Sequence, residues 1–429
     1  MPKSEKTKKR QTKHTASLQN AASPSEKLSQ GEKKAGEKTW GGFSTMWEYE
    51  KTRKKLKEAK SAVPVTVLLC VLFTLALGSI IFVFFTAYRN VAAGKDAREP
   101  SGDGSGQVES ADGTKTCCSL EDVEDARSVA RRLGIAHYVF NFTDDFYKEV
   151  VDPFVDTYYQ GGTPNPCILC NRHLKFGKLM QRATELGCDW VVSGHYARVE
   201  QDRSTGRYLL KRAADRAKDQ TYFLACLSQE QLARVQFPLG GLTKEQVREI
   251  AAEHGFLNAR KHDSQDICFV PGGDYTAFLE EYTGRKLCPG DFLDASGHTL
   301  GHHRGAVCYT IGQRRGLGLA MGEPVYVCRK DMGANTVTVG PDEALYSPAL
   351  RAKDWVWFPF ETLTAPMEVT AKIRHSQYDR PATVFPEPDG TARVVFAEPQ
   401  RAISPGQAVV LYQGDTVVGG GTITAAATK

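Results

Sequence analysis

The chain has 429 residues, which is enough for two or three domains, and it carries a formal net charge of +5. The charge is unevenly distributed, because residues 1–64 hold 16 Lys and Arg against 7 Asp and Glu and leave the rest of the chain at −4. This excludes a uniformly basic folded surface. A nucleic-acid site in the folded part must therefore rest on a local basic patch.

The first 45 residues are rich in Lys, Ser, Thr, Gln and Gly and contain almost no aliphatic side chains. Such a segment buries too little apolar surface to offset the entropy of ordering. We therefore predict a basic disordered tail over residues 1–64, with a basic amphipathic stretch from Trp47 to Lys60. A transit peptide is the competing interpretation, and the glutamates of the tail and its preference for Lys over Arg oppose it.

Residues 65–87 carry no charge and are mostly Val, Leu, Ile and Phe. The run is long enough to cross a bilayer core of about 30 Å, so we predict one transmembrane helix here, with a buried core helix as the alternative. Lys and Arg crowd its N-terminal flank, which would place the tail in the cytoplasm and the larger part outside. The chain's 11 cysteines, which follow no regular framework, instead indicate a reduced, cytosolic protein. The sequence leaves both locations open.

A Gly-, Asp- and Ser-rich linker is predicted over residues 88–115. Beyond it, helical patterns alternate with short apolar runs, which predicts an α/β domain with a parallel sheet over residues 116–268. The predicted elements are a capped helix from Ser119 to Gly134, a strand over 135–142, a helix over 146–159 interrupted at Pro153, a helix from Asn171 to Gly187, and a strand over 190–193. Gly194 and His195 follow this last strand, where ligands bind in such sheets, although a simple turn with a hydrogen-bonded histidine fits equally well.

Two cysteines, Cys167 and Cys170, stand at the start of the predicted helix, after the stiff turn Thr163-Pro164-Asn165-Pro166. Unpaired N–H groups and the helix dipole at such a position lower the pKa of a thiol. A zinc half-site and a buried structural role are the alternatives. A further cysteine, Cys268, lies about a hundred residues later. We predict that Cys170 and Cys268 meet in space and handle sulfur.

In the second half of the chain, capped helices give way to glycine-rich loops and short alternating runs typical of strands. Lys218-Asp219-Gln220 precedes an apolar run, with Asp219 as a possible helix cap, and Thr243 to Gln246 form a capping box. Residues 309–318 predict a strand followed by a basic, glycine-rich loop suited to phosphates. Short alternating runs then predict a C-terminal β-barrel over residues 346–429, after a small central domain over 269–345. The predicted barrel strands are 369–373, 382–385, 392–397, 408–412 and 416–423.

From about Thr116 to the C-terminus the chain resembles the bacterial tRNA-specific 2-thiouridylase (MnmA) family. The matching segments are Cys117-Cys118-Ser119 with Asp125-Ala126-Arg127, the stretch Asn165–Asn171, Gly194-His195-Tyr196-Ala197-Arg198, Lys218-Asp219-Gln220, Asp263–Phe269, the loop at 309–318, and Ser404-Pro405-Gly406-Gln407. The resemblance implies a nucleotide-binding α/β domain of the PP-loop (adenine nucleotide hydrolase-like) type, a central domain and a β-barrel. It also implies a cytoplasmic location for the catalytic part.

The resemblance further implies replacement of the 2-oxygen of a wobble uridine in tRNA by sulfur, with ATP, accompanied by Mg²⁺, activating that oxygen. Cys268 would carry a persulfide received from a sulfur carrier or cysteine desulfurase, and Cys170 would take up the resulting disulfide. The implied binding residues are Gly194 for ATP, Asn165, Pro166 and Cys167 for the target base, and His195, Lys218, Asp219, Gln220, Arg374, His375 and Gln407 for tRNA. His375 stands where the family usually has a tyrosine. No resident metal is implied.

One motif of the family is not found in the sequence. Its first strand leads into a Ser-Gly-Gly-x-Asp-Ser loop whose backbone N–H groups cradle the phosphates of ATP. Here the tail and the apolar segment occupy that place, and Gly102 to Gly106 lack both the pattern and a preceding strand. An incomplete sheet is therefore expected. The alternative function is a catalytically incomplete tRNA-binding protein, or a gene-fusion product, anchored to the membrane through residues 65–87 if that helix inserts.

Overall fold

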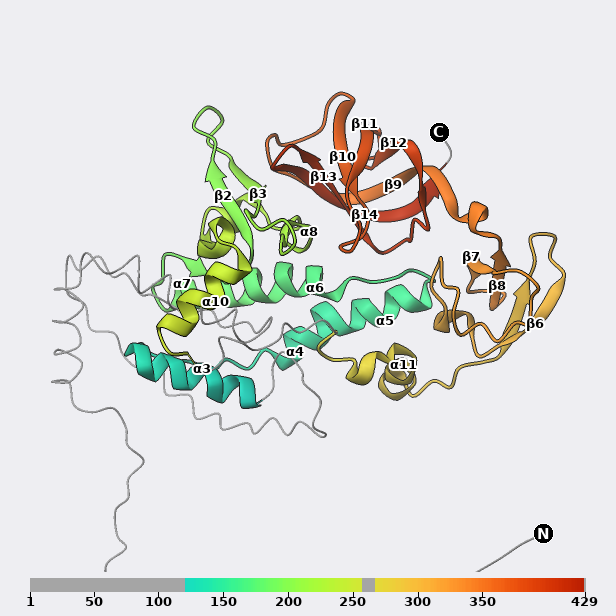
Figure 1. Ribbon diagram of the computed structural model, residues 1–429, viewed down its shortest axis with the longest axis horizontal. Coiled ribbons are helices and arrows are strands. Elements are labelled where there is room, and N and C mark those ends of the chain that lie inside the picture. Colours follow the sequence, from blue (N-terminus) through green and yellow to red (C-terminus); the bar gives the residue numbers. More distant parts are fainter. Residues whose placement is uncertain (1–119, 257–266, 428–429) are drawn as a thin grey trace, which may run out of the picture. The chain divides into compact units, whose positions relative to one another are not determined.

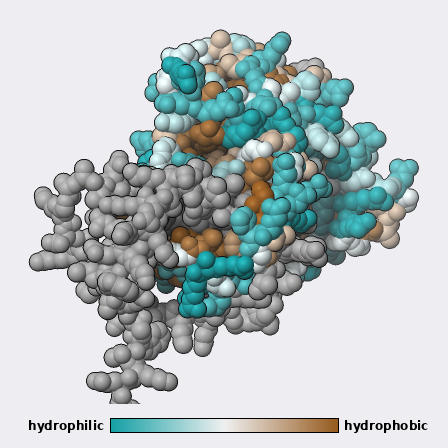
Figure 2. Space-filling model, turned by 60° about the vertical axis from the view of Figure 1, so that its left-hand side comes forward, coloured by the Kyte–Doolittle hydropathy of each residue, from teal (hydrophilic) through white to brown (hydrophobic). Residues whose placement is uncertain are grey.

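The computed structural model describes residues 120–256 and 267–427. The predicted tail, transmembrane helix and linker, and the place of the phosphate loop, lie outside the described residues. Within the described ranges, no helix is both long and apolar enough to cross a membrane. Figure 2 shows a described surface that is mostly polar on this face, with small hydrophobic patches between the polar side chains.

The first described helix is α3 (Leu120–Leu133), which ends at Gly134 with a φ of 67°, as predicted. The strand predicted over 135–142 is wrong, because these residues form no regular structure. Tyr138 and Val139 in this segment are 54% and 58% exposed. A strand needs a neighbour for its backbone hydrogen bonds, and no described strand pairs with this segment.

Two long helices, each containing a π-helical stretch, follow. The first runs through α4 (Thr143–Phe146), η1 (Tyr147–Val151) and α5 (Asp152–Tyr159), and the second through α6 (Pro166–Leu169), η2 (Cys170–Lys178) and α7 (Leu179–Glu185). Pro153 does not break the first helix. The proline lacks the N–H of the ordinary i→i−4 bond, and the turn just before it is π-helical.

The second helix begins five residues earlier than the predicted start at Asn171. Pro166 occupies its first turn, a position that suits the fixed φ of proline and its missing N–H. The two helices pack side by side, and Lys178 Nζ lies 2.8 Å from Asp145 Oδ1 while His173 Nδ1 lies 3.6 Å from Glu149 Oε2.

The parallel sheet predicted for the α/β domain is present as one short pair in the described residues. Strand β1 (Val191–Val192) pairs in parallel with β4 (Val235–Gln236). The elements around this pair are β2 (Ala197–Gln201), β3 (Tyr208–Arg212), α8 (Thr221–Leu224), α9 (Gln229–Leu232), η3 (Pro238–Gly241) and α10 (Lys244–Glu253). The predicted capping box of Thr243 and Gln246 at the start of α10 is confirmed.

The central part contains a helix and a small mixed sheet. Its elements are η4 (Pro271–Gly273), α11 (Tyr275–Thr283), β5 (Gly290–Leu293), β6 (Thr299–His303), η5 (Ala306–Cys308), β7 (Tyr326–Asp331), β8 (Thr336–Gly340) and η6 (Asp342–Leu345). The sheet order is β6-β5-β8-β7. The strand predicted at the start of 309–318 is wrong, since those residues follow a 3-10 turn and form a loop.

The predicted C-terminal barrel is confirmed (Figure 1, orange to red). Its strands are β9 (Tyr346–Trp357), β10 (Met367–Lys372), β11 (Arg380–Pro386), β12 (Ala392–Arg401), β13 (Ala408–Gln413) and β14 (Thr416–Ala427). The order β13-β10-β11-β12-β9-β14 closes into a ring because β13 also pairs with β14. Strand β9 was not predicted. The β2–β3 hairpin extends the sheet through the pair Thr416 and Lys211.

Candidate functional site

The start of the second long helix carries the two neighbouring cysteines. Cys167 is exposed and lies in the first turn, whereas Cys170 is partly buried and begins the π-helical stretch. The N–H of Cys170 already donates to the carbonyls of Pro166 and Cys167. The predicted placement at the helix terminus therefore holds for Cys167, while Cys170 lies just beyond the first turn, where the effect of the dipole has weakened.

The cysteines differ in how far burial suppresses their thiolates. Burial raises the pKa of the thiols of Cys188, Cys308 and Cys328, and raises that of Cys226 to about 12. A neutral thiol is a poor nucleophile. Of the remaining described cysteines, Cys288 lies in the central part, beside the sheet. Cys167, Cys170 and Cys268 remain as candidates for sulfur chemistry. No disulfide links the eight described cysteines.

Cys268 lies between two side chains that anchor its segment. Ile267 and Phe269 pack into the core formed by α5 and the central domain. The ring of Phe269 lies 5.5 Å from that of Phe146 and 5.0 Å from that of Phe154, both on the first long helix. The helix that carries Cys170 packs against this same first helix. The two thiol-bearing segments therefore share one supporting element, and residues 263–266 before Cys268 lie outside the described residues.

The barrel holds the turn that precedes Cys167. Gln407 Nε2 donates to the carbonyl oxygens of Thr163 at 3.0 Å and Pro164 at 3.2 Å. The N–H of Thr163 donates to Pro405 O at 2.7 Å. The backbone approaches closely here, because a Cβ on Gly406, whose φ is +86°, would lie 3.0 Å from the Thr163 carbonyl oxygen. Gln407, predicted to contact tRNA, thus contacts the backbone next to the target-base segment.

Tyr222, which the sequence analysis did not single out, joins the same contact. Its side chain is fully buried, and its hydroxyl donates to Ala408 O at 3.0 Å. The same hydroxyl lies 3.5 Å from Gln407 Oε1, so Tyr222 also contacts the residue that holds the Thr163 and Pro164 carbonyls. An aromatic residue in an apolar run gives no sequence signal for this role.

The triplet Lys218-Asp219-Gln220 is largely turned inward. Asp219 is 6% exposed, and its carboxylate accepts hydrogen bonds from Ala213 N at 2.9 Å and from Thr221 Oγ1 at 2.5 Å. Gln220 Oε1 accepts from Tyr196 N at 2.9 Å. Asp219 is not the helix cap that its position suggested, because Gln220 occupies the N-cap of α8 without a side-chain cap. The triplet therefore joins α8 to the turn after β1, and Lys218 and Gln220 are both half-buried.

Gly194 and His195 lie in that turn, beyond the carboxyl end of β1. Ser193 Oγ lies 2.7 Å from His195 Nδ1, and the imidazole packs against Phe176 and Phe237 at centroid distances of 5.6 and 5.9 Å. Burial, helped by the charge of Lys175, holds the pKa of His195 well below its ordinary value, so the ring is neutral at pH 7. His195 is thus hydrogen-bonded within the turn, and Gly194 is buried beside it.

Arg374 and His375 lie in the loop that follows the end of β10 at Lys372. Arg374 Nη2 donates to Ala402 O at 2.5 Å and Ser404 Oγ at 3.1 Å, next to the Gln407 segment. The His375 ring lies 4.4 Å from that of Phe223 and remains exposed. Arg374 therefore braces the segment that holds the Thr163 turn, and His375 offers a stacking surface.

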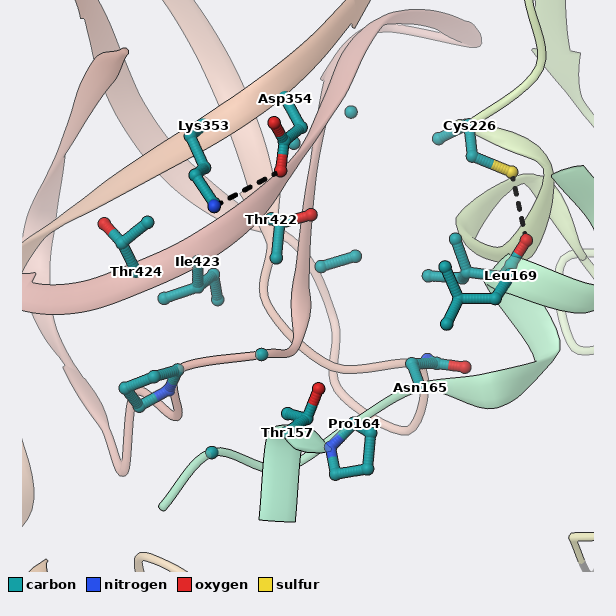
Figure 3. Close-up of a pocket in the computed structure, with 18 of the residues that line it drawn as sticks. Thr157, Pro164, Asn165, Leu169, Cys226, Lys353, Asp354, Thr422, Ile423 and Thr424 are labelled. Atoms are coloured by element: carbon teal, nitrogen blue, oxygen red, sulfur yellow. Dashed lines mark hydrogen bonds and ion pairs between the residues drawn. The ribbon is translucent and has the colours of Figure 1, made fainter. Parts of the chain in front are cut away.

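A cavity of about 500 Å³ lies between the start of the cysteine helix and the barrel (Figure 3). Its labelled lining includes Asn165 and Leu169 on one side, Lys353 and Asp354 of β9 on another, and Thr422 of β14. The described residues contain no cluster of three His, Cys, Asp or Glu side chains able to hold a metal ion, so the zinc alternative finds no ligand set among them.

Comparison with known proteins covers most of the chain. Residues 105–272 match the family described as tRNA methyl transferase HUP domain, residues 276–341 its PRC-barrel domain, and residues 347–423 the aminomethyltransferase beta-barrel domain. The chain is 54% identical over 309 residues to the tRNA-specific 2-thiouridylase MnmA of Heliobacterium modesticaldum, covering 72% of this chain and 80% of that protein. It is 50% identical over 307 residues to the enzyme of the same name from Acetivibrio thermocellus, covering 72% and 86%. The chain belongs to the tRNA-specific 2-thiouridylase family.

Proposed function

We propose that this chain is a tRNA-uridine 2-sulfurtransferase that places sulfur on C2 of the wobble uridine. One observation carries the proposal. The helix bearing Cys170 and the segment bearing Cys268 pack against the same long helix, while Gln407 holds Thr163 and Pro164 in the turn that leads into the Cys170 helix. Relatives about 50% identical are named for this activity.

The cysteines have distinct roles in the proposed reaction. Cys268 carries a persulfide, and its terminal sulfur bonds to C2 of the uridine while the activated 2-oxygen leaves. The Cys170 thiolate bonds to the Sγ of Cys268, so the sulfur–sulfur bond of the persulfide breaks and a Cys170–Cys268 disulfide remains. A reductant then restores both thiols. Asn165, Pro166 and Cys167 border the base, and the neutral side chain of His195 supports the turn at Gly194.

ATP, with Mg²⁺, would supply the adenylyl group that makes the 2-oxygen a leaving group. Gly194, at the carboxyl end of β1 in a nucleotide-binding type of domain, is the described residue that would border such a site. The persulfide would come from a sulfur carrier or a cysteine desulfurase. We place the reaction in the cytoplasm, where tRNA and reduced thiols occur together.

The test is ATP-dependent thiolation of tRNA by the full chain, with a cysteine desulfurase and cysteine as the sulfur source and mass spectrometry of 2-thiouridine as the readout. Cys268→Ser and Cys170→Ser should each abolish product and leave tRNA binding intact. Cys288→Ser, an exposed cysteine of the central part, is the matched control and should retain activity.

Undiminished thiolation by Cys268→Ser would refute its role. Binding of tRNA by the wild-type chain without any ATP-dependent thiolation would favour the alternative, a tRNA-binding protein. The absence of a Ser-Gly-Gly-x-Asp-Ser motif from the sequence is the observation behind that second candidate.

A further inference from the structure

The cavity beside Asn165 is separate from the proposed sulfur chemistry. Its lining comes from α5, α6, α8 and the barrel strands β9 and β14, and it includes neither Cys167, Cys170 nor Cys268. Among the described cysteines, Cys226 alone lines it, and burial raises the pKa of its thiol to about 12. Because the cysteines of the proposed reaction lie outside this lining, we assign the cavity an occupant other than the base that receives sulfur. It is nevertheless next to that base, because Asn165 belongs to both sites.

The walls combine the groups that a nucleotide needs. Ile168, Leu169 and Val356 supply an apolar surface for a base, and Thr157, Thr422 and Asn165 supply hydroxyl and amide groups at its edge. Two exposed cations, Arg172 and Lys353, stand at the opening and suit a phosphate. Lys353 Nζ is 3.9 Å from Asp354 Oδ2, so the pair is loose and both groups face solvent. A cavity of about 500 Å³ lies in the size range of small-molecule sites.

The barrel wall is deformed at this place. The β9–β14 ladder shifts register between Gly420 and Thr422 and again between Ile423 and Ala425. Asp354, opposite the first shift, has a φ of 55°, in the left-handed region. Bulges and strained residues of this kind re-aim side chains and gather next to functional sites. Figure 3 shows Asp354 and Thr422 on adjacent parts of this wall.

Glycines of β14 allow this strand to approach Ala225 and Trp355 closely. A Cβ on Gly420 would lie 2.8 Å from atoms of Ala225, and one on Gly421 would lie 2.8 Å from the ring of Trp355. Side chains at these positions would push α8 or Trp355 away from β14. The cavity therefore depends on backbone-only surface along β14.

We infer that this cavity holds the nucleotide next to the target uridine in the anticodon loop, with its base on the apolar wall and its phosphate near Lys353 and Arg172. The inference rests on the proposed function, since it presumes tRNA as the substrate. Unstacked single-stranded bases are what proteins commonly read in RNA loops, and a captured neighbour would present the target base to the cysteine helix.

The test pairs protein variants with altered substrates. The substrates are an anticodon stem-loop and two versions with an abasic site 5′ or 3′ of the target uridine. Thr422→Phe should fill the cavity, Lys353→Ala removes an exposed cation, and Arg203→Ala, on the exposed turn between β2 and β3, is the control. Thiolation kinetics and stem-loop binding by fluorescence anisotropy are both measured, with circular dichroism to check folding.

With the wild-type chain, one abasic site should raise KM and Kd about tenfold, the scale of one base–protein stacking contact. Thr422→Phe should cause a similar rise with the intact stem-loop, and the abasic site should then add nothing. Lys353→Ala should weaken binding and Arg203→Ala should not.

Equal effects of the abasic site on the wild type and on Thr422→Phe would overturn the inference, as would no effect of either abasic site. If Thr422→Phe does not fold, the Lys353→Ala and abasic-site measurements decide. If the wild-type chain binds the stem-loop without thiolating it, the proposed function fails while the binding measurements still decide on the cavity.

Discussion

The barrel and the cysteine-bearing α/β region differ in how the backbone N–H and C=O groups of their strands are hydrogen-bonded. The barrel closes on itself, because β13 pairs with both β10 and β14, and side chains such as Val394, Leu411 and Val418 are at most 1% exposed. The α/β region has one described parallel pair of two residues each, and its segment 135–142 belongs to none of the described strands. The closed ring satisfies its own strand hydrogen bonds, whereas the Cys170 helix is held by contacts with neighbouring elements.

A few hydrogen bonds from the barrel region hold the turn before the Cys170 helix. Gln407 and Pro405 of the barrel region hold the backbone of Thr163 and Pro164, and the hydroxyl of Tyr222 contacts Gln407 and the backbone at Ala408. The barrel region therefore positions the turn that leads into the Cys170 helix. Four substitutions test this comparison, from the largest expected effect to the smallest.

Leu411→Ala should lower the free energy of unfolding of the barrel by about 2–5 kcal/mol, because the side chain is fully buried and its removal leaves a cavity. Urea denaturation followed by tryptophan fluorescence measures this, since Trp355 and Trp357 lie in β9. A loss below 1 kcal/mol, on the order of an exposed substitution, would contradict a self-sufficient barrel core.

Gln407→Ala should lower kcat for thiolation by about tenfold to a hundredfold, because small displacements of a positioned reacting group have effects of this size. The free energy of unfolding of the barrel should fall by no more than the contribution of one to two hydrogen bonds, about 1–3 kcal/mol. A change confined to KM would instead assign Gln407 to direct tRNA contact.

Below about pH 6.5, the α/β region should lose stability through His195. Its pKa is held below the ordinary value of 6.5 in the folded state, so the unfolded chain binds the extra proton first as the pH falls. The stability is thus fully present above pH 6.5 and declines below it, by at most about 1.4 kcal/mol per pH unit for one proton. Denaturation at pH 7 and 5.5 should show a smaller decline for His195→Gln than for the wild type; an equal decline would count against the burial of this imidazole.

Val139→Ala should change the free energy of unfolding by no more than about 0.5 kcal/mol, because the side chain is 58% exposed in the segment without a strand partner. The same denaturation experiment measures it beside Leu411→Ala. A loss as large as that of the barrel variant would mean that residues 135–142 pack in a strand after all.

The sequence predicted well where the pattern and the local chemistry coincide. Five barrel strands, the capped helix α10 and the end of α3 at Gly134 all follow from alternation, capping residues or glycine. Strand β9 was missed because Pro348 and Asp354 interrupt its alternation, although both lie within it. The strand at 135–142 had the right composition, but strand formation depends on a partner that composition does not reveal.

The residues of the candidate site that local sequence patterns mark were predicted, and those that depend on distant contacts were not. Cys167 and Cys170 stood out because of their spacing and the prolines before them. The burial of Asp219 and the part played by Tyr222 depend on contacts with residues far away in the chain, such as Ala408. No local pattern of residues encodes such contacts.

The most direct test of the central claim is peptide mass spectrometry of the chain after a single turnover, with free thiols blocked on quenching. We expect one new cross-linked peptide pair, joined through a disulfide between Cys170 and Cys268, in proportion to the 2-thiouridine formed. Product formed with both thiols still free, or with Cys268 joined to Cys167 instead, would contradict it.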